Sequence, residues 1–112
     1  MNDFSPQLVD SGGGATRLST CISAIRQVYD PEILINVYDL GLIYLIECMD
    51  DENRIVMTLT SANCPEAQSL PEKVRSTVEK ITGQKTCIEV VFDPTWDIDN
   101  LKDEIKLELG IL

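Results

Sequence analysis

The chain has 112 residues, 44% of them hydrophobic, which is enough for one domain with a modest apolar core. Its 19 acidic and 9 basic residues give a formal net charge of −10. This balance argues against nucleic acid or an anionic membrane as partner, because phosphate surfaces need clustered Lys and Arg. There is no histidine, which excludes Ser-His-Asp and Cys-His nucleophiles and imidazole metal sites.

The N-terminus lacks a basic segment followed by an apolar run, and no stretch approaches the about 18 apolar residues of a spanning helix. We therefore expect a cytoplasmic protein, in which the cysteines are free thiols. The four cysteines are Cys21, Cys48, Cys64 and Cys87. None lies two or three residues from another, so the spacing predicts no closed zinc site.

Residues 1–15 include a Ser-Gly-Gly-Gly run and show no hydrophobic period, so we expect a disordered tail followed by one domain over residues 16–112. A first helix is predicted from about Thr16, with an apolar stripe of Leu18, Ile22, Ile25 and Val28. Pro31 should end this helix, because the residue before a proline is pushed out of the α region.

Residues 40–49 form a nearly continuous apolar run and residues 54–60 alternate, so two strands joined by the polar turn 50–53 predict an antiparallel hairpin. A second helix follows, with Leu70, Val74, Val78 and Ile81 on one face and Gly83 after its end. It begins either at Pro65 or, with a capping box, at Ser69.

A third strand over 85–92 and a last helix carrying Leu101, Ile105 and Leu109 complete the chain. The order α-β-β-α-β-α predicts a two-layer α/β sandwich of the α+β kind.

Thr60-Ser61-Ala62-Asn63-Cys64-Pro65 is the most informative segment, because it places a cysteine between a strand end and a helix start. Free N–H groups and the helix dipole there favour a thiolate, the form that soft metals and iron–sulfur clusters bind. The hydroxyls of Thr60 and Ser61 are placed to donate to that sulfur. A free cysteine that only fills a loop is the alternative. For the other three cysteines, packing in the core or on a strand face is the expected role.

Two further segments carry polar residues at turns. Asp30-Pro31-Glu32 either aims two carboxylates across a cleft or merely ends the first helix. Gly41 permits a bulge, and Asp39 can close a turn. Trp96 is expected to anchor the last helix to the sheet. The Gly12-Gly13-Gly14 run lacks the Lys-Ser/Thr of a nucleotide loop, so the sequence gives poor support to a nucleotide-dependent enzyme.

Five segments occur together in one order: Asp30-Pro31-Glu32, Tyr38 to Ile43, Leu59-Thr60-Ser61 with Cys64-Pro65, Asp93-Pro94-x-Trp96, and Leu109-Gly110. From about residue 18 to the end, the chain resembles the family of iron–sulfur cluster assembly domains that includes SufT, PaaD and the N-terminal domain of Mrp-type ATPases.

The resemblance implies an α/β fold of the iron–sulfur cluster assembly domain type and a non-enzymatic role in assembling or maturing clusters. It also implies that Cys64 is the critical residue. It further implies that Asp30, Glu32 and Thr60 lie near that cysteine, which favours the functional role of the acids. Our hypothesis is that Cys64, supported by these residues and Ser61, handles iron or a transient iron–sulfur cluster, with no tightly bound cofactor. One thiol cannot supply all the ligands of a cluster, so a homodimer, a recipient protein or small thiols must complete them.

The implied partners are the iron–sulfur assembly machinery and recipient apo-proteins. An acidic adaptor that holds no metal is one alternative. An accessory factor for a multicomponent oxygenase is another. It is disfavoured because that branch of the family carries a cysteine-rich C-terminal extension, which we expect this protein to lack. A thiol redox enzyme is also disfavoured, because no resolving cysteine lies near Cys64 in the sequence.

Overall fold

The computed structural model describes residues 6–12, 15–31, 34–60, 69–92, 96 and 107. Within these ranges the elements are β1 (Gln7–Ser11), α1 (Ala15–Ile25), β2 (Ile43–Met49), β3 (Glu52–Met57), α2 (Leu70–Thr82) and β4 (Lys85–Val90). The predicted last helix lies outside the described residues, apart from Leu107, which has helical conformation.

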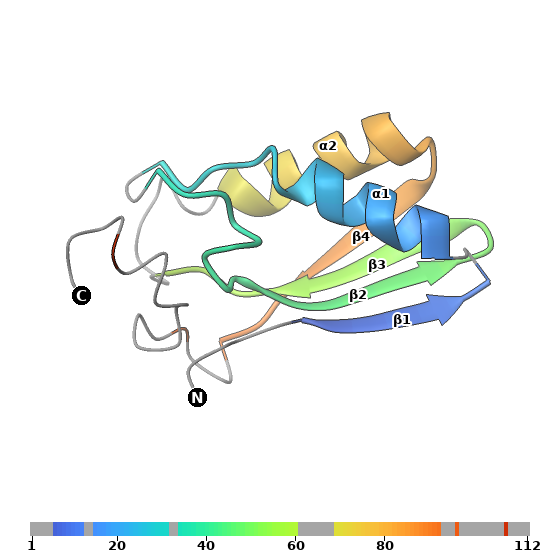
Figure 1. The fold of residues 1–112 in the computed structure, drawn as a ribbon, viewed down its shortest axis with the longest axis horizontal. Helices are drawn as coiled ribbons and strands as arrows, with labels where there is room; N and C mark the ends of the chain where they lie inside the picture. The colour runs from blue at the N-terminus through green and yellow to red at the C-terminus, as the bar shows by residue number, and fades with distance from the viewer. Residues whose placement is uncertain are drawn as a thin grey trace.

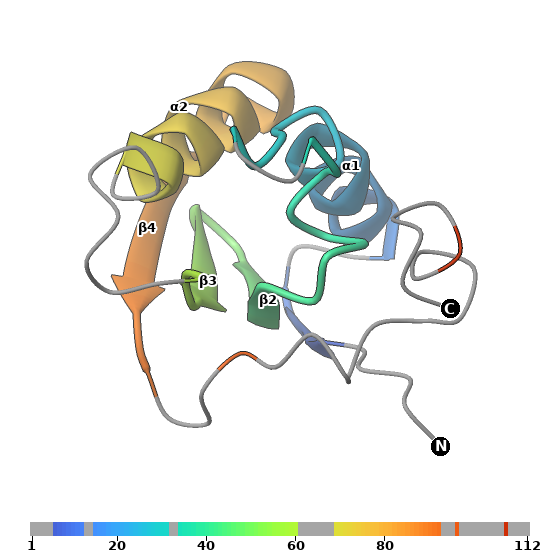
Figure 2. The same cartoon turned by 90° about the vertical axis from the view of Figure 1, so that its left-hand side faces the viewer.

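The four strands form one sheet in the order β1-β2-β3-β4. β2 and β3 pair antiparallel, with Glu47 opposite Arg54, which confirms the predicted hairpin. β1 runs parallel to β2, and β4 parallel to β3. Both helices cover the same face of the sheet (Figures 1 and 2). The predicted two-layer α+β sandwich is therefore confirmed.

The expectation of a disordered tail over residues 1–15 is wrong for the segment that forms β1. Gln7–Ser11 pairs along β2, from Gln7 beside Leu45 to Ser11 beside Met49. Edge pairing of this kind is made by backbone groups and needs little side-chain burial. Leu8 is indeed 46% exposed. Because β1 does not need to bury one side, its sequence shows no hydrophobic period that would predict a strand.

The core lies between the helices and the sheet. The predicted stripe on α1 faces it, with Ile25 buried and Leu18 and Ile22 partly buried. From β3 and the later part of β2, side chains at every second position point toward the helices, as the pleat requires, and the register shifts between Ile43 and Leu45. The fully buried hydrophobic side chains of the two helices and of the central strands are Cys21, Ala24, Ile25, Leu70, Val74, Val78, Ile43, Ile46, Cys48, Ile55 and Met57.

α1 ends at Ile25, earlier than Pro31 predicts. Turn-type bonds follow, from Gln27 N–H to Ala24 O and from Val28 N–H to Ile25 O. The chain then pairs with itself, because Val37 N–H donates to Val28 O at 2.9 Å. This local pairing takes the backbone groups that a longer helix would have used.

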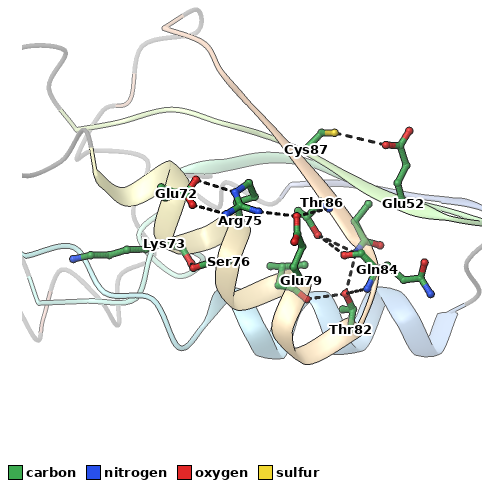
Figure 3. Close-up of polar contacts among 12 residues, drawn as sticks. Glu52, Glu72, Lys73, Arg75, Ser76, Glu79, Thr82, Gln84, Thr86 and Cys87 are labelled. Carbon is green, nitrogen blue, oxygen red and sulfur yellow. Dashed lines mark hydrogen bonds and ion pairs between the residues drawn. The ribbon is translucent and has the colours of Figure 1, made fainter.

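The structure selects the later of the two predicted starts for α2. The helix begins at Leu70 after Ser69, so Pro71 falls in the first turn, where it removes no helical bond. The capping box is not formed, since the Ser69 side chain makes no capping bond. Glu72 pairs with Arg75 instead (Figure 3). Gly83 ends the helix in the left-handed region, with φ of 72°.

Candidate functional site

One end of the domain collects the segments that the sequence singles out. α1 ends there, β2 begins there, β3 ends there and α2 begins there (Figure 1, left; Figure 2, toward the viewer). The Asp30 segment follows α1, and Thr60 follows β3. We use the term loop end for the described residues 28–31, 34–42, 58–60 and 96.

Asp30 sits in a tight bend at the loop end and is only 1% exposed. Its N–H donates to Ile35 O at 3.0 Å, and its carbonyl accepts from Leu34 N–H at 2.9 Å. Leu34 closes the bend with a φ of 66°, which is costly for a side chain of its size, and it is 72% exposed. The bend therefore holds the Asp30 carboxyl in a sheltered place with a fixed backbone.

A second turn follows at residues 36–41. Asn36 donates from Nδ2 to Asp39 Oδ2 at 2.9 Å and accepts from Asp39 N–H on Oδ1 at 2.9 Å, so the two side chains close the turn. Arg26 pairs with Asp39 at 3.2 Å and lies 4.9 Å over the ring of Tyr38. Gly41 exits the turn with φ of 82°, a conformation that glycine tolerates.

Further hydrogen bonds connect this turn, and Leu42 after it, to the rest of the domain. Thr58 N–H donates to Leu42 O at 2.8 Å, which joins the turn to the end of β3. Trp96 Nε1 donates to Leu40 O at 2.7 Å, and the indole packs against the core. Trp96 thus contacts the turn at residues 36–41, and the last helix that it was expected to anchor lies outside the described residues.

The end of β3 brings polar groups to the same place. Thr58 is fully buried, and its Oγ1 has no hydrogen-bond partner within the described part of the chain. Leu59 is buried, whereas Thr60 is partly exposed at a bend. Thr60 and Asp30 therefore both lie at the loop end. Glu32, Ser61 and Cys64 fall outside the described residues, so their approach to Asp30 stays a prediction.

Two of the other three cysteines pack in the core, as expected, and the third lies on an exposed strand face. Cys21 and Cys48 are fully buried, with their sulfur atoms 3.5 Å apart. Burial raises the pKa of Cys21 to about 12 and also raises the pKa of Cys48. Cys87 is exposed on β4, and its thiol donates to Glu52 Oε2 at 3.6 Å (Figure 3).

A polar network holds α2 against β4 at its C-terminal half (Figure 3). Glu79 Oε2 accepts from Thr86 N–H at 3.1 Å and from Arg75 at 2.8 Å. The Thr86 N–H and the Arg75 guanidinium together hold the pKa of Glu79 below its ordinary value. Asn53, buried under the network, donates to Thr82 and Thr86. These contacts fix the helix whose first turn borders the loop end.

Sequence reasoning missed two residues that shape the loop end, Arg26 and Asn36. The Asn36-x-x-Asp39 spacing before Gly41 is the signal that predicts this side-chain-closed turn. Among the described residues, no three Cys, Asp or Glu side chains gather closely enough to hold a metal ion. A metal or cluster at the loop end would thus need ligands beyond those the described residues supply.

A buried acid in a rigid bend, a side-chain-closed turn and a polar strand end therefore lie together at one end of an α+β sandwich. This pattern accompanies a specific family match. The model of the family described as iron–sulfur cluster assembly protein matches residues 19–90. The chain belongs to this family, as the resemblance implied.

Curated relatives extend the match over most of the chain. It is 46% identical over 93 residues to an Fe-S protein maturation auxiliary factor of Porphyromonas gingivalis, covering 81% of this chain and 89% of the relative. It is 34% identical over 87 residues to the auxiliary factor SufT of Staphylococcus aureus, covering 75% and 98% of the two chains. The chain is therefore SufT-like.

Solved structures agree on the fold. A domain of unknown function from Bacillus anthracis superimposes with a TM-score of 0.78 at 25% identity, over 87% of this chain and 94% of that one. A conserved hypothetical protein from Thermotoga maritima gives a TM-score of 0.71 at 29% identity, over 82% and 92%. Across the residues that the structure describes, no helix has the length and apolar character needed to cross a membrane.

Proposed function

We propose that this protein is a non-enzymatic auxiliary factor in the maturation of iron–sulfur proteins, and that it acts through the thiol of Cys64. The observation that carries the proposal is the convergence of the family's motif segments at the loop end. The Asp30 bend, the 36–41 turn and the end of β3 are joined there by backbone bonds, and Trp96 closes the turn.

Asp30 supports this role by its placement. A carboxyl group that is 1% exposed costs free energy to bury, and a protein retains such a group where it serves a purpose. The bend that holds it includes the strained Leu34, and strain of this kind concentrates at functional sites. In the proposal, the hydroxyls of Thr60 and Ser61 donate hydrogen bonds that favour the Cys64 thiolate. Asp30 and Glu32 orient the sulfur or complete an open site around it.

The cluster or iron ion is cargo in this proposal. One thiol supplies one ligand, and a cluster needs several thiolates. The cargo is therefore shared with a recipient apo-protein, with the assembly machinery or with a second copy of this chain. Transient sharing suits a delivery factor, because a complete set of ligands would retain the cluster instead of releasing it.

The central test replaces Cys64 with serine and compares it with a matched control. Cys64→Ser removes the thiolate with little change in volume, so we expect complementation of a deletion strain to fall to background when an iron–sulfur enzyme is assayed. Cys87→Ser is the control, because Cys87 is an exposed thiol on β4. It should complement fully. Equal complementation by the two variants would show that Cys64 is dispensable.

A second measurement separates cargo handling from a purely adaptor role, for which the net charge of −10 is the supporting observation. The protein is incubated anaerobically with iron and sulfide, and absorbance and iron content are measured. Handling of cargo predicts iron that is bound by the parent protein and lost in Cys64→Ser. An adaptor predicts no iron in either sample, together with binding of the assembly machinery that survives the substitution.

A further inference from the structure

A second pair of thiols lies away from the loop end, in the interface between helix and sheet. Cys21 on α1 and Cys48 on β2 face each other with Sγ atoms 3.5 Å apart. Both residues are fully buried. The two positions are 27 residues apart in the chain, so tertiary packing alone brings the sulfurs into contact.

The surrounding contacts hold the two sulfurs in register. Arg17, one helical turn before Cys21, reaches across to the chain just after Cys48, where its guanidinium donates to Met49 O and, at 3.2 Å, to Asp50 O. On the other side, Asp10 of β1 pairs beside Cys48 in the sheet. The start of α1 and the end of β2 are therefore fixed relative to each other.

We propose that Cys21 and Cys48 form an oxidisable dithiol, which a hydroperoxide converts into a disulfide between α1 and β2. The sulfur atoms need to approach from 3.5 Å to the bonded distance of about 2.0 Å. Rotation of the two side chains and a small shift of α1 accomplish this. The inference is independent of the function proposed for Cys64.

Burial raises the pKa of both thiols, and Arg17 acts against that rise at each of them. Either thiol can therefore be the first to react. When Cys48 reacts first, its thiolate attacks one peroxide oxygen, an S–O bond forms, and the O–O bond breaks. The departing alkoxide takes up a proton and becomes an alcohol. Cys48 is left as a sulfenic acid.

The Cys21 sulfur then attacks the Cys48 sulfur. The S–S bond forms, the S–O bond breaks, and water leaves with the proton of Cys21. Overall the two thiols lose two electrons, and one hydroperoxide is reduced to an alcohol and water. Because both thiols are buried, the reaction proceeds when α1 opens from the sheet, and it is slower than at an exposed thiolate.

The disulfide would stabilise the domain. It closes a loop of the chain that includes the Asp30 bend and the 36–41 turn, and it restricts that segment in the unfolded state. A cross-link over this span should raise the melting temperature by about 10 °C in a domain of this size. The pair thus acts as a covalent staple that forms under oxidising stress and is undone by reduction.

The test uses the full chain with Cys64→Ser and Cys87→Ser, so that only the two buried thiols remain. The reduced protein is treated with hydrogen peroxide, unfolded, alkylated and weighed by mass spectrometry. We expect a mass loss of two hydrogens, no alkylation and one peptide that links Cys21 to Cys48. The melting temperature should be about 10 °C higher than that of the reduced protein, and dithiothreitol should reverse this increase. Adding Cys21→Ala should abolish both the link and the shift.

Other outcomes would overturn the proposal. Two thiols that remain fully alkylatable after peroxide treatment just below the melting temperature, where α1 opens, would show that the pair does not react. Uptake of oxygen without a link, or a link between two chains, would show that the sulfurs are not paired for this reaction. If the double variant does not fold, peptide mapping of all four cysteines in the parent protein gives the same answer.

Discussion

The helix–sheet interface and the loop end are built on different physical principles. The interface, formed by the buried side chains of α1, α2, β2 and β3, is held by apolar burial, which is nondirectional and grows with the area removed from water. The loop end also places apolar side chains such as Leu40 and Leu42 in the core. Its backbone geometry, however, is set by single directed bonds, such as Thr58 N–H to Leu42 O and Trp96 Nε1 to Leu40 O. The two regions therefore differ in what fixes their geometry, while both contribute apolar burial to stability.

Truncating a side chain at the centre of the interface should produce the largest change in stability. Ile55 is fully buried on β3 and pairs with Ile46 of β2. Ile55→Ala removes apolar contacts and leaves a cavity, so we expect the free energy of unfolding to fall by about 3–4 kcal/mol, measured by urea denaturation. The loop end should keep its own geometry in the fraction that is folded.

Val56→Ala is the matched control, because Val56 is the next residue and points to the other face of β3, where it is only partly buried. A cost of about 1 kcal/mol or less is expected there. Equal costs at the two positions would show that the helix-covered face does not carry the stability of the sheet.

The buried thiols make the stability of the helix–sheet interface depend on pH. Because burial raises the pKa of Cys21 from 9.0 to about 12, the unfolded chain loses this proton at a lower pH than the folded one. The associated stability is fully present below pH 9.0 and is lost as pH rises toward the folded pKa. We expect a loss of about 2 kcal/mol near pH 11 under reducing conditions, measured by urea denaturation.

The slope with pH, rather than the absolute stability, carries this second prediction. Cys21→Ala should flatten the alkaline decline, whereas Cys87→Ala should leave it unchanged, because Cys87 is exposed. A decline of the same steepness in all three proteins would place its origin in other groups and would remove the thiol pair as the cause.

The two regions also differ in how far the sequence predicts them. The interface follows from periodicity, because the stripe at Ile22 and Ile25 predicts the first helix and the alternation at Ile55 and Met57 predicts a strand of the hairpin. β1 is not predicted by such reasoning, because this edge strand pairs in parallel with β2 through backbone groups and shows no side-chain period. The early end of α1 is not predicted by it either, since the bonds that compete with the helix form at residues 28–37.

At the loop end, sequence motifs predict which segments meet, and local bond geometry decides how. The motifs single out Asp30 and Thr60, and both residues lie at the loop end. Their positions depend on the left-handed Leu34 and on the Asn36–Asp39 pair, neither of which has a hydrophobic signature. The placement of Cys64, Glu32 and Ser61 beside Asp30 remains a prediction of the family resemblance.

The smallest stability effect and the most local one should come from Trp96→Phe. Phenylalanine retains an aromatic ring against the core but removes the Nε1 bond to Leu40 O. We expect a global cost of about 1 kcal/mol, as for a single neutral hydrogen bond, and faster hydrogen exchange at Leu40 and Thr58 than at the amides of β3. Tyr29→Phe is the control at the same end, since Tyr29 is 56% exposed. Uniformly faster exchange over β3 and the loop end together would mean that the two regions unfold as one unit, and that the bond to Leu40 O has no local effect.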